Sequence, residues 1–482
     1  MHPIHLFPRL AVAALAAVTV LVSACGGGGG GSSSGGGSAG GGGTSACSET
    51  ARKQFVLDAT REWYLFTDLL PASVNIADYA TGEDLLNALT ATAREQHKDR
   101  YFSYLTTKAA EDSLLGEGQF NGFGFRTRTE TGNRPFILDV FENSPAMDAG
   151  MQRGDEIVAV DQGSGFVAVS QLLANGATIT DLLGPSDVGV HRGLRLLRGG
   201  STLEVSLTKR TVTIDPVPDS FGVRTLPLAG TTGVGYVNLR SYISTADAQL
   251  ISAFAQFPAG MHYFIIDLRY NGGGLVSTSQ LINDLLGGAR SSSDVEFNTL
   301  YNTAKASRNN STTRFKSLPE SVQSVLQPVQ PVRIAFLTTD GTASASEMNV
   351  NSMKPWVEVA IVGGNTLGKP VGQLAFDLTG CQDRLRLISF KTTNSLGQGD
   401  YYDGLASSMQ FACAATDTLD KQMGDPADAL TSAALSWIQT GTCAAVIAAN
   451  AAGIAKPGAA EANRYPLPKK PSAAQFWVPG IN

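Results

Sequence analysis

Residues 263–274 read Tyr-Phe-Ile-Ile-Asp-Leu-Arg-Tyr-Asn-Gly-Gly-Gly, so a continuous apolar run ends in charged and glycine residues. Continuous apolar runs are typical of strands that are buried on both faces, as in parallel sheets. Residues 275–286 follow with a helical pattern. Apolar runs at residues 332–337 and 357–362 predict two more buried strands with a helix between them. This alternation of strands and helices indicates an α/β layer arrangement for residues 213–445.

The regions on either side of this core have different patterns. Residues 46–115 have apolar residues at helical spacing, which predicts an N-terminal helical domain with an aromatic stripe in its core. Residues 116–212 change to short strands separated by turns. Residues 446–482, a C-terminal tail, are rich in alanine and then in proline, and they give no structural signal.

The composition excludes several classes of protein. The chain has 482 residues, 43% of them hydrophobic, so it can bury a sizeable core in roughly two to four domains. A formal net charge of −6 argues against a nucleic-acid-binding protein, which usually presents a basic face.

The N-terminus reads as a targeting signal followed by a tether. Residues 1–24 contain an apolar run that is too short to span a bilayer but is typical of a secretory signal peptide. The run ends in Leu-Val-Ser-Ala-Cys, which resembles a bacterial lipobox and predicts lipidation of Cys25. The alternative is an ordinary signal peptide cut near Ala24. Residues 25–45 then form a linker rich in glycine and serine, which is typical of a flexible coil.

These features predict a lipid-anchored protein of the bacterial cell envelope. Because Gly26 is not aspartate, we expect the anchor to lie at the periplasmic face of the outer membrane. No other segment is apolar enough to span a bilayer.

Four cysteines remain after Cys25: Cys47, Cys381, Cys413 and Cys443. They lack the Cys-x-x-Cys or Cys/His spacing of a zinc site, so we expect no metal. In an oxidising compartment they allow two disulfides in three connectivities. We favour Cys381–Cys413 and Cys47–Cys443, and buried free thiols are the alternative.

A candidate nucleophile lies in residues 341–347, Gly-Thr-Ala-Ser-Ala-Ser-Glu, directly after the expected strand 332–337. Small residues permit a tight turn, and a helix that starts there would place its N-terminal amides beside Ser344. Lys369 follows the end of the next expected strand, so both side chains should lie at one edge of the sheet. Without further support, such a small-residue turn is more often purely structural.

A lysine is the better candidate for the base. The histidines after the signal peptide are His97, His191 and His262, and none lies in a recognisable catalytic pattern. A serine can instead be activated by a lysine that is neutral at the working pH. Such a lysine must be desolvated, since burial lowers its pKa.

Residues 342–347, with Lys369 placed 25 residues after Ser344 and Gln373 four residues further, resemble the C-terminal processing (tail-specific) serine proteases. Residues 267–274 are similar to the Asp-Leu-Arg-x-Asn-x-Gly-Gly motif of that family. The resemblance implies a multidomain α/β fold: an N-terminal helical segment, a β-rich PDZ domain over residues 116–212, and a crotonase-like (ClpP-like) protease core over residues 213–445.

The resemblance also implies roles for the site residues. Ser344 is the nucleophile, Lys369 the general base, and Gln373 the residue that orients the lysine amine. The implied oxyanion hole consists of the backbone N–H groups of Ala345 and of Gly273 or Gly274.

Two competing assignments and one departure accompany these roles. Ser346 is the rival nucleophile, although it leaves only 23 residues to Lys369. Residues 206–209, Ser-Leu-Thr-Lys, match a Ser-x-x-Lys pattern by chance, because they lie in an expected strand. Pro370 departs from the glycine that follows the lysine in many members.

By the same resemblance, a loop at the start of the PDZ domain holds the C-terminal carboxylate of a peptide. Its residues are Gly122, Phe123, Gly124 and Phe125. Glycines let backbone donors approach an anion closely. The alternative is a turn that opens a strand and binds no ligand.

The sequence thus predicts a serine endopeptidase that needs no metal or cofactor. It would cleave exported or unfolded polypeptides after the PDZ domain has bound their free C-termini. The expected partners are these polypeptides, the membrane through the lipid anchor, and a regulatory adaptor protein; no nucleic acid is expected. A non-catalytic lipoprotein that binds protein C-termini as a scaffold is the alternative function.

Overall fold

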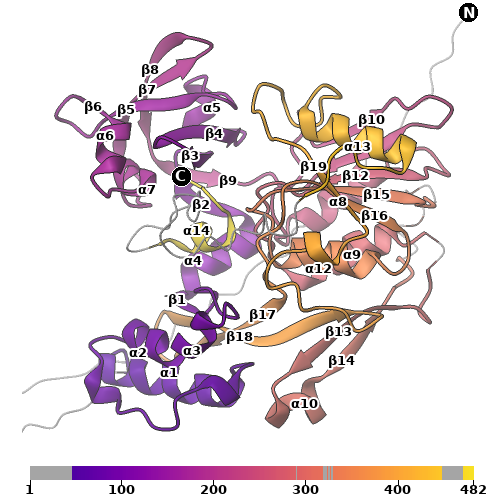
Figure 1. The fold of residues 1–482 in the computed structure, drawn as a ribbon. Helices are drawn as coiled ribbons and strands as arrows, with labels where there is room; N and C mark the ends of the chain where they lie inside the picture. Colours follow the sequence, from indigo (N-terminus) through magenta and orange to yellow (C-terminus); the bar gives the residue numbers. More distant parts are fainter. Residues whose placement is uncertain (1–45, 289, 319–322, 324–325, 327–328, 448–470) are drawn as a thin grey trace, which may run out of the picture. The chain divides into compact units, whose positions relative to one another are not determined.

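The computed structural model describes residues 46–288, 290–318, 323, 326, 329–447 and 471–482 (Figure 1). The expected signal peptide, the lipidation site Cys25 and the linker lie outside the described residues. Within the described ranges, no helix is both long and apolar enough to cross a membrane.

In the described part of the chain, six strands form the central sheet of the α/β core. Its order is β10 (Val223–Leu226), β11 (Val234–Asn238), β12 (Tyr263–Asp267), β15 (Arg333–Thr338), β16 (Glu358–Gly363) and β19 (Phe411–Ala414). The strands from β11 to β19 run parallel, and β10 pairs antiparallel with β11. The expected buried strand at residues 263–267 lies inside this sheet, so its two faces both need cover.

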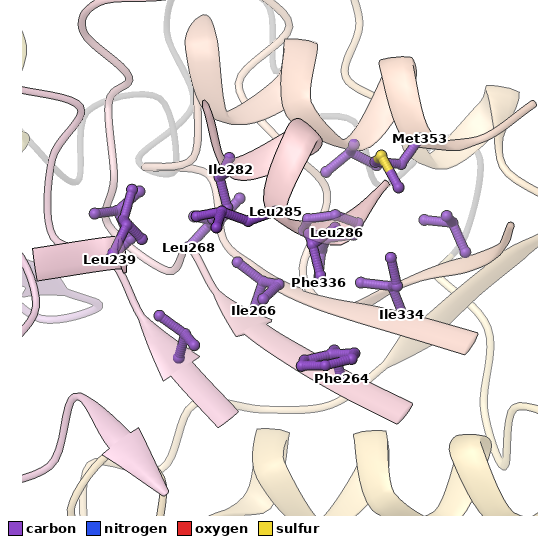
Figure 2. Close-up of a cluster of buried hydrophobic side chains, with 14 of the residues drawn as sticks. Leu239, Phe264, Ile266, Leu268, Ile282, Leu285, Leu286, Ile334, Phe336 and Met353 are labelled. Atoms are coloured by element: carbon purple, nitrogen blue, oxygen red, sulfur yellow. The ribbon is translucent and has the colours of Figure 1, made fainter. Parts of the chain in front are cut away.

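Helices provide that cover. α8 (Ala246–Phe254), α9 (Val276–Leu286) and α12 (Ala345–Met353) share one apolar cluster with the sheet, and α13 (Ala429–Thr440) shares another (Figure 1). Successive residues of β12 alternate between the clusters: Ile266 belongs to the first and Ile265 to the second. Figure 2 shows Leu285 of α9 near Leu268 and Leu286 near Phe336 of β15, within the same apolar cluster. Each such buried side chain contributes about 1.5–3 kcal/mol to stability.

A second sheet, which is antiparallel, packs against the N-terminal helices. It consists of β1 (Tyr104–Thr107), β18 (Asp383–Asn394), β13 (Val295–Tyr301) and β14 (Ser311–Arg314) in that order, with β17 (Val371–Asp377) paired to β18. The helices are α1 (Glu49–Trp63), α2 (Gly82–Leu89) and α3 (Ala91–Glu95). Their apolar side chains share one cluster with Val371, Leu385 and Leu387. Residues 46–115 therefore do not have a core of their own, and they include a strand, β1, that the helical pattern did not predict.

The segment from residue 119 to residue 213 is β-rich and has its own apolar cluster. Its main sheet contains β3 (Phe125–Glu130), β4 (Arg134–Val140), β5 (Glu156–Asp161), β7 (His191–Arg198) and β8 (Ser201–Thr208), with β6 (Phe166–Ala168) beside β5. The helices are α5 (Pro145–Asp148), α6 (Val169–Ala174) and α7 (Ile179–Leu183). A ribbon of β2 (Gln119–Gly122) and β9 (Arg210–Thr213) leads into and out of this β-rich domain.

Buried ion pairs connect the β-rich domain to the α/β core. Arg240, just after β11, donates two hydrogen bonds to the Asp139 carboxylate of β4 at 2.8 and 2.9 Å, and both side chains are almost fully buried. Arg153 of the β-rich domain pairs with Asp417 of the core. Because a buried charge without its partner is costly, removing one member of such a pair destabilises a protein by about 3–5 kcal/mol.

The predicted cysteine pairing is wrong. The structure joins Cys47 to Cys381 and Cys413 to Cys443, with Cα–Cα distances of 5.6 and 4.9 Å. Packing explains the pairs: α1, which follows Cys47, packs on β18 beside the turn that carries Cys381. Cys413 lies on β19, and the segment after α13 returns to that strand through a bridge between Cys413 and Val446.

Candidate active site

Ser344 lies at a strained turn between β15 and α12. Its φ of 56° is in the left-handed region. Residues other than glycine rarely adopt this backbone conformation, which costs them about 1–3 kcal/mol. The Ala343 N–H donates to the Asn271 carbonyl oxygen at 3.0 Å, and the Thr339 N–H donates to Thr342 Oγ1 at 3.0 Å. The turn therefore presents the serine at the N-terminus of a helix, where the helix dipole favours negative charge.

Lys369 lies in the loop after β16 and is 9% exposed. Its Nζ donates a hydrogen bond to Gln373 Oε1 at 2.8 Å. Burial lowers the pKa of Lys369 to about 8; the charges of Asp99 and Glu347 oppose this shift, and that of Arg386 adds to it. About a tenth of the lysine is therefore uncharged at pH 7, and about half at pH 8.

The N-terminal segment orients the glutamine that contacts the lysine. Gln373 Nε2 donates to the Phe102 carbonyl oxygen, which turns Oε1 toward Lys369. The Asp99 carboxylate holds this backbone through the N–H groups of Phe102 and Ser103, at 2.8 and 3.2 Å. Sequence reasoning found no chemical role for residues 46–115, and nothing in the sequence indicated that the Phe102 carbonyl oxygen would contact Gln373.

Ser344 and Lys369 line the same small pocket. Most of the other residues around it are apolar or aromatic: Val276, Ala345, Met348, Pro370, Val371 and Phe390. An apolar wall excludes water from the lysine, which is the physical cause of its lowered pKa.

Glu347 connects the two loops of the site. This fully buried carboxylate accepts hydrogen bonds from the backbone N–H groups of Ser344, Gly368 and Lys369 at 2.9, 2.7 and 2.7 Å. Burial raises the pKa of Glu347, while hydrogen bonds from Thr366 and from the three N–H groups act in the opposite direction. The motif that contains Glu347 was found in the sequence, but this role was not predicted.

The glycine-rich loop after β12 packs directly against the serine turn. A Cβ at Gly273 would lie 2.8 Å from Ala345 N and 2.9 Å from Ser344 Cβ, so only glycine fits there. The Gly273 N–H donates to Asn271 Oδ1 at 2.9 Å. A Cβ at Gly274 would lie 2.1 Å from the Tyr242 carbonyl oxygen. Of the two glycines considered for the oxyanion hole, Gly273 thus already has its N–H engaged.

The competing residues are engaged elsewhere. Ser346 is fully buried, and its Oγ donates to the Asn271 carbonyl oxygen at 2.9 Å. Lys209 Nζ donates to the carbonyl oxygens of Gly184 and Pro185, and Ser206 lies on β8. In the described ranges, no group of three or more histidine, cysteine, aspartate or glutamate side chains is arranged to hold a metal ion.

The loop proposed to hold a carboxylate surrounds a main-chain oxygen. The N–H groups of Phe123, Gly124 and Phe125 lie 3.1, 2.9 and 3.3 Å from the Asn482 oxygen. Gly124 has a φ of 85°, and a Cβ there would lie 2.1 Å from Ser144 Cβ. The structure therefore brings the predicted loop residues together around an acceptor from the C-terminal segment.

Two family models match this chain. The model for peptidase family S41 matches residues 233–400, and the model for the S41 peptidase N-terminal domain matches residues 51–104. The first match contains the serine turn, the glycine-rich loop and the lysine loop. The second contains the N-terminal helices that pack on β18.

The chain is also similar to curated carboxyl-terminal-processing peptidases. The chloroplastic carboxyl-terminal-processing peptidase 1 of Arabidopsis thaliana is 27% identical over 58% of this chain and 53% of its own length. The carboxyl-terminal-processing protease of Synechocystis is 26% identical over 54% of this chain and 56% of its own length. The chain therefore spans about half the length of these relatives. Together, these matches indicate peptidase family S41.

A solved structure shares the fold. A Bacteroides fragilis protein assigned to the S41 proteases has a TM-score of 0.61 and 22% identity, covering 80% of this chain and 97% of that chain. This likeness supports the mixed α/β fold seen here.

Proposed function

We propose that this protein is a serine endopeptidase of the C-terminal processing type, with Ser344 as nucleophile and Lys369 as general base. One observation carries the proposal: a serine at a strained turn and a buried lysine with a pKa lowered to about 8 line the same pocket. A lysine whose pKa is lowered by burial and that lies beside a serine is typical of an activated nucleophile.

The proposed chemistry proceeds through an acyl-enzyme. Neutral Lys369 accepts the proton of Ser344 Oγ as this oxygen attacks a peptide carbonyl carbon. The resulting oxyanion is stabilised by the N–H groups of Ala345 and Gly274, because Gly273 donates to Asn271.

Collapse of the oxyanion gives the acyl-enzyme, and hydrolysis of this ester completes the reaction. Protonated Lys369 passes its proton to the departing amine, and the C–N bond breaks. A water molecule that Lys369 deprotonates then attacks the carbonyl carbon of the acyl-enzyme ester. As the C–O bond to Ser344 breaks, Lys369 returns the proton to Ser344 Oγ, which regenerates both groups. Gln373 keeps the amine directed toward the serine through its 2.8 Å hydrogen bond.

Substrate recognition is proposed to fall to the β-rich domain acting as a PDZ domain. A peptide would add as a strand to the edge of β3, and its terminal carboxylate would lie on the N–H groups of residues 123–125. The expected substrates are exported or unfolded polypeptides with free C-termini, delivered directly or by an adaptor protein. Lipidation at Cys25 would keep the enzyme at the periplasmic face of the outer membrane.

A peptide-binding lipoprotein without catalysis is the alternative. It would use the same loop at residues 122–125 and would leave the lysine and serine without a role. The buried Lys369 argues against it, because burying an ammonium group costs stability. A catalytic role would explain why the chain keeps a lysine there, whereas a binding protein would gain nothing from it.

Cleavage of an unfolded reporter protein with an apolar C-terminus tests the proposal. Wild type, Ser344→Ala and Lys369→Ala would be compared, with Ser346→Ala as the matched serine control and thermal unfolding as the check on folding. We expect cleavage by wild type and Ser346→Ala and none by the other two. Cleavage that survives Ser344→Ala in a folded protein would overturn the assignment.

A further inference from the structure

The last described segment, residues 471–482, ends on the edge of β3, where residues 480–482 pair with that strand. The Asn482 N–H donates to the Phe125 carbonyl oxygen at 2.9 Å, and the Thr127 N–H donates to the Gly480 carbonyl oxygen at 2.8 Å. Ile481 pairs antiparallel with Arg126 between these two bonds. This register is strand addition to a sheet edge, with the Asn482 oxygen held by three N–H groups at the end of the strand.

Apolar side chains anchor the segment in the joint between the β-rich domain and the core. Ile481, Val478 and Trp477 are at most 6% exposed. They share a cluster with residues of both regions: Phe120, Phe141, Val212 and Ile243. The segment also contains α14 (Ala473–Trp477), which begins with a capping box at Ser472 and Gln475. Backbone pairing and apolar burial thus act together to hold it.

The same segment reaches the candidate active site. The Trp477 ring lies 5.6 Å from Lys369 Nζ, and its Nε1 donates to Glu111 Oε1 at 3.1 Å. The Trp477 carbonyl oxygen and the Pro479 ring pack on Gly272: a Cβ there would lie 2.5 Å from that oxygen. Gly272 lies two residues before Gly274 of the proposed oxyanion hole. One segment therefore occupies the peptide edge and packs beside the catalytic loops.

We propose that residues 471–482 are an intramolecular ligand that fills the peptide-binding edge of β3, and that a substrate tail must displace them to bind. The physical reason is that Phe125, Thr127 and the loop at residues 123–125 offer one set of backbone donors and acceptors, which two strands cannot share. A tethered ligand competes at an effective concentration in the millimolar range. The apparent affinity for a second peptide is therefore the intrinsic affinity multiplied by the fraction of molecules whose β3 edge is open.

Peptide binding by the full chain tests the displacement. The probe is a labelled synthetic peptide with the sequence of residues 475–482, Gln-Phe-Trp-Val-Pro-Gly-Ile-Asn, and all proteins carry Ser344→Ala so that the probe stays intact. Ile481→Asp places a charge in the buried joint and should release the segment. Val446→Asp is the matched control, since Val446 is 71% exposed. We expect the Ile481→Asp protein to bind the probe about tenfold more tightly than the control.

Amide hydrogen exchange gives a readout that does not depend on the probe. The N–H groups of residues 123–125 and 127 should be protected in the wild-type chain and in Val446→Asp, and should exchange faster in Ile481→Asp. Trp477→Ala is a second releasing variant if Ile481→Asp does not fold. Equal probe affinities in releasing and control variants, or unprotected amides in the wild type, would overturn the proposal.

This inference rests on the proposed function only in calling the displaced ligand a substrate. Neither binding nor exchange requires catalysis. An inactive wild type with a protected β3 edge would therefore overturn the peptidase proposal and leave the intramolecular ligand standing.

Discussion

The serine–lysine edge of the core and the loop at residues 122–125 both depend on backbone N–H groups, but their acceptors differ. At the serine–lysine site, the acceptor is the Glu347 carboxylate, which is buried and belongs to α12, the helix that begins directly after Ser344. At the loop, the acceptor is the main-chain oxygen of Asn482, on a segment that pairs with β3 along one edge. The first arrangement is part of the core, whereas we propose that the second can be exchanged for another strand.

This difference separates chemistry from recognition. Catalytic groups gain from a rigid arrangement, because positioning them in advance lowers the cost of reaching the transition state. A recognition edge must instead release one strand to bind the next. The following changes affect one of the two regions and should leave the other intact.

The largest effect is expected from Lys369→Met, which keeps the approximate shape of the side chain and removes the proposed base. We expect kcat/KM to fall by about 10³-fold or more, with peptide binding unchanged. Because burial disfavours the charged lysine only in the folded state, Lys369 should add stability as the pH rises from about 8 to about 10.4, and Lys369→Met should lose this contribution. Lys209, whose pKa burial also lowers to about 8, should keep its own contribution in both proteins. Steady-state kinetics and denaturant unfolding at several pH values measure both effects. A variant that retained activity would remove the lysine from the mechanism.

The second prediction concerns the pH dependence of the wild type. Only neutral Lys369 can accept a proton, so kcat/KM should rise with pH through an apparent pKa of about 8. Between pH 6 and pH 9 the increase should be roughly a hundredfold. Binding of the peptide probe to the Ser344→Ala protein should be nearly flat over the same range. A profile without an inflection near pH 8 would contradict the role of the lysine.

Glu347→Gln should have a smaller effect. An amide offers one acceptor oxygen where the carboxylate offers two, so a backbone N–H loses its partner and the two loops loosen, for a loss of about tenfold in kcat. Because the Glu347 charge raises the pKa of Lys369, its removal should move the inflection of the pH profile below about 8. Glu358→Gln on β16 is the control. An unchanged inflection would mean that Glu347 does not influence the lysine.

The smallest effect is expected at the exchangeable edge. Thr127→Val keeps the side-chain shape and removes the acceptor of a 3.0 Å hydrogen bond from Asn482 Nδ2. A hydrogen bond of this kind contributes about 0.5–1.5 kcal/mol, so amide exchange of residues 123–125 should accelerate a few-fold. Thr129→Val on the same strand is the matched control. Equal exchange in both variants would show that this contact does not help to hold the segment.

The features that the sequence predicted best are local ones. The apolar run at residues 263–267 and the runs before Ser344 and Lys369 indicated strands of one sheet, and the parallel pairing of β12, β15 and β16 brings their ends to one edge. Because Ser344 and Lys369 follow the ends of successive strands, the sequence predicted that they would lie at the same edge of the sheet. Their catalytic roles remain predictions.

Contacts between distant segments were missed. Neither the pairing of Cys47 with Cys381 nor the hydrogen bond from Gln373 to Phe102 has a signature in residue spacing, because both arise when the N-terminal helices pack on β18. The segment at residues 471–482 gave no signal for a related reason. An isolated short helix and an extended strand are stable only against partners, and those partners belong to other domains.

The measurement that tests the central claim most directly is covalent labelling with a fluorophosphonate, which needs no knowledge of the natural substrate. The labelled residue would be identified by peptide mapping, and the labelling rate would be followed from pH 6 to pH 9 in the wild type and in Lys369→Met. The account predicts a single adduct on Ser344, a rate that rises through pH about 8, and no labelling in the variant. An adduct on Ser346, or labelling that is unaffected by Lys369→Met, would contradict it.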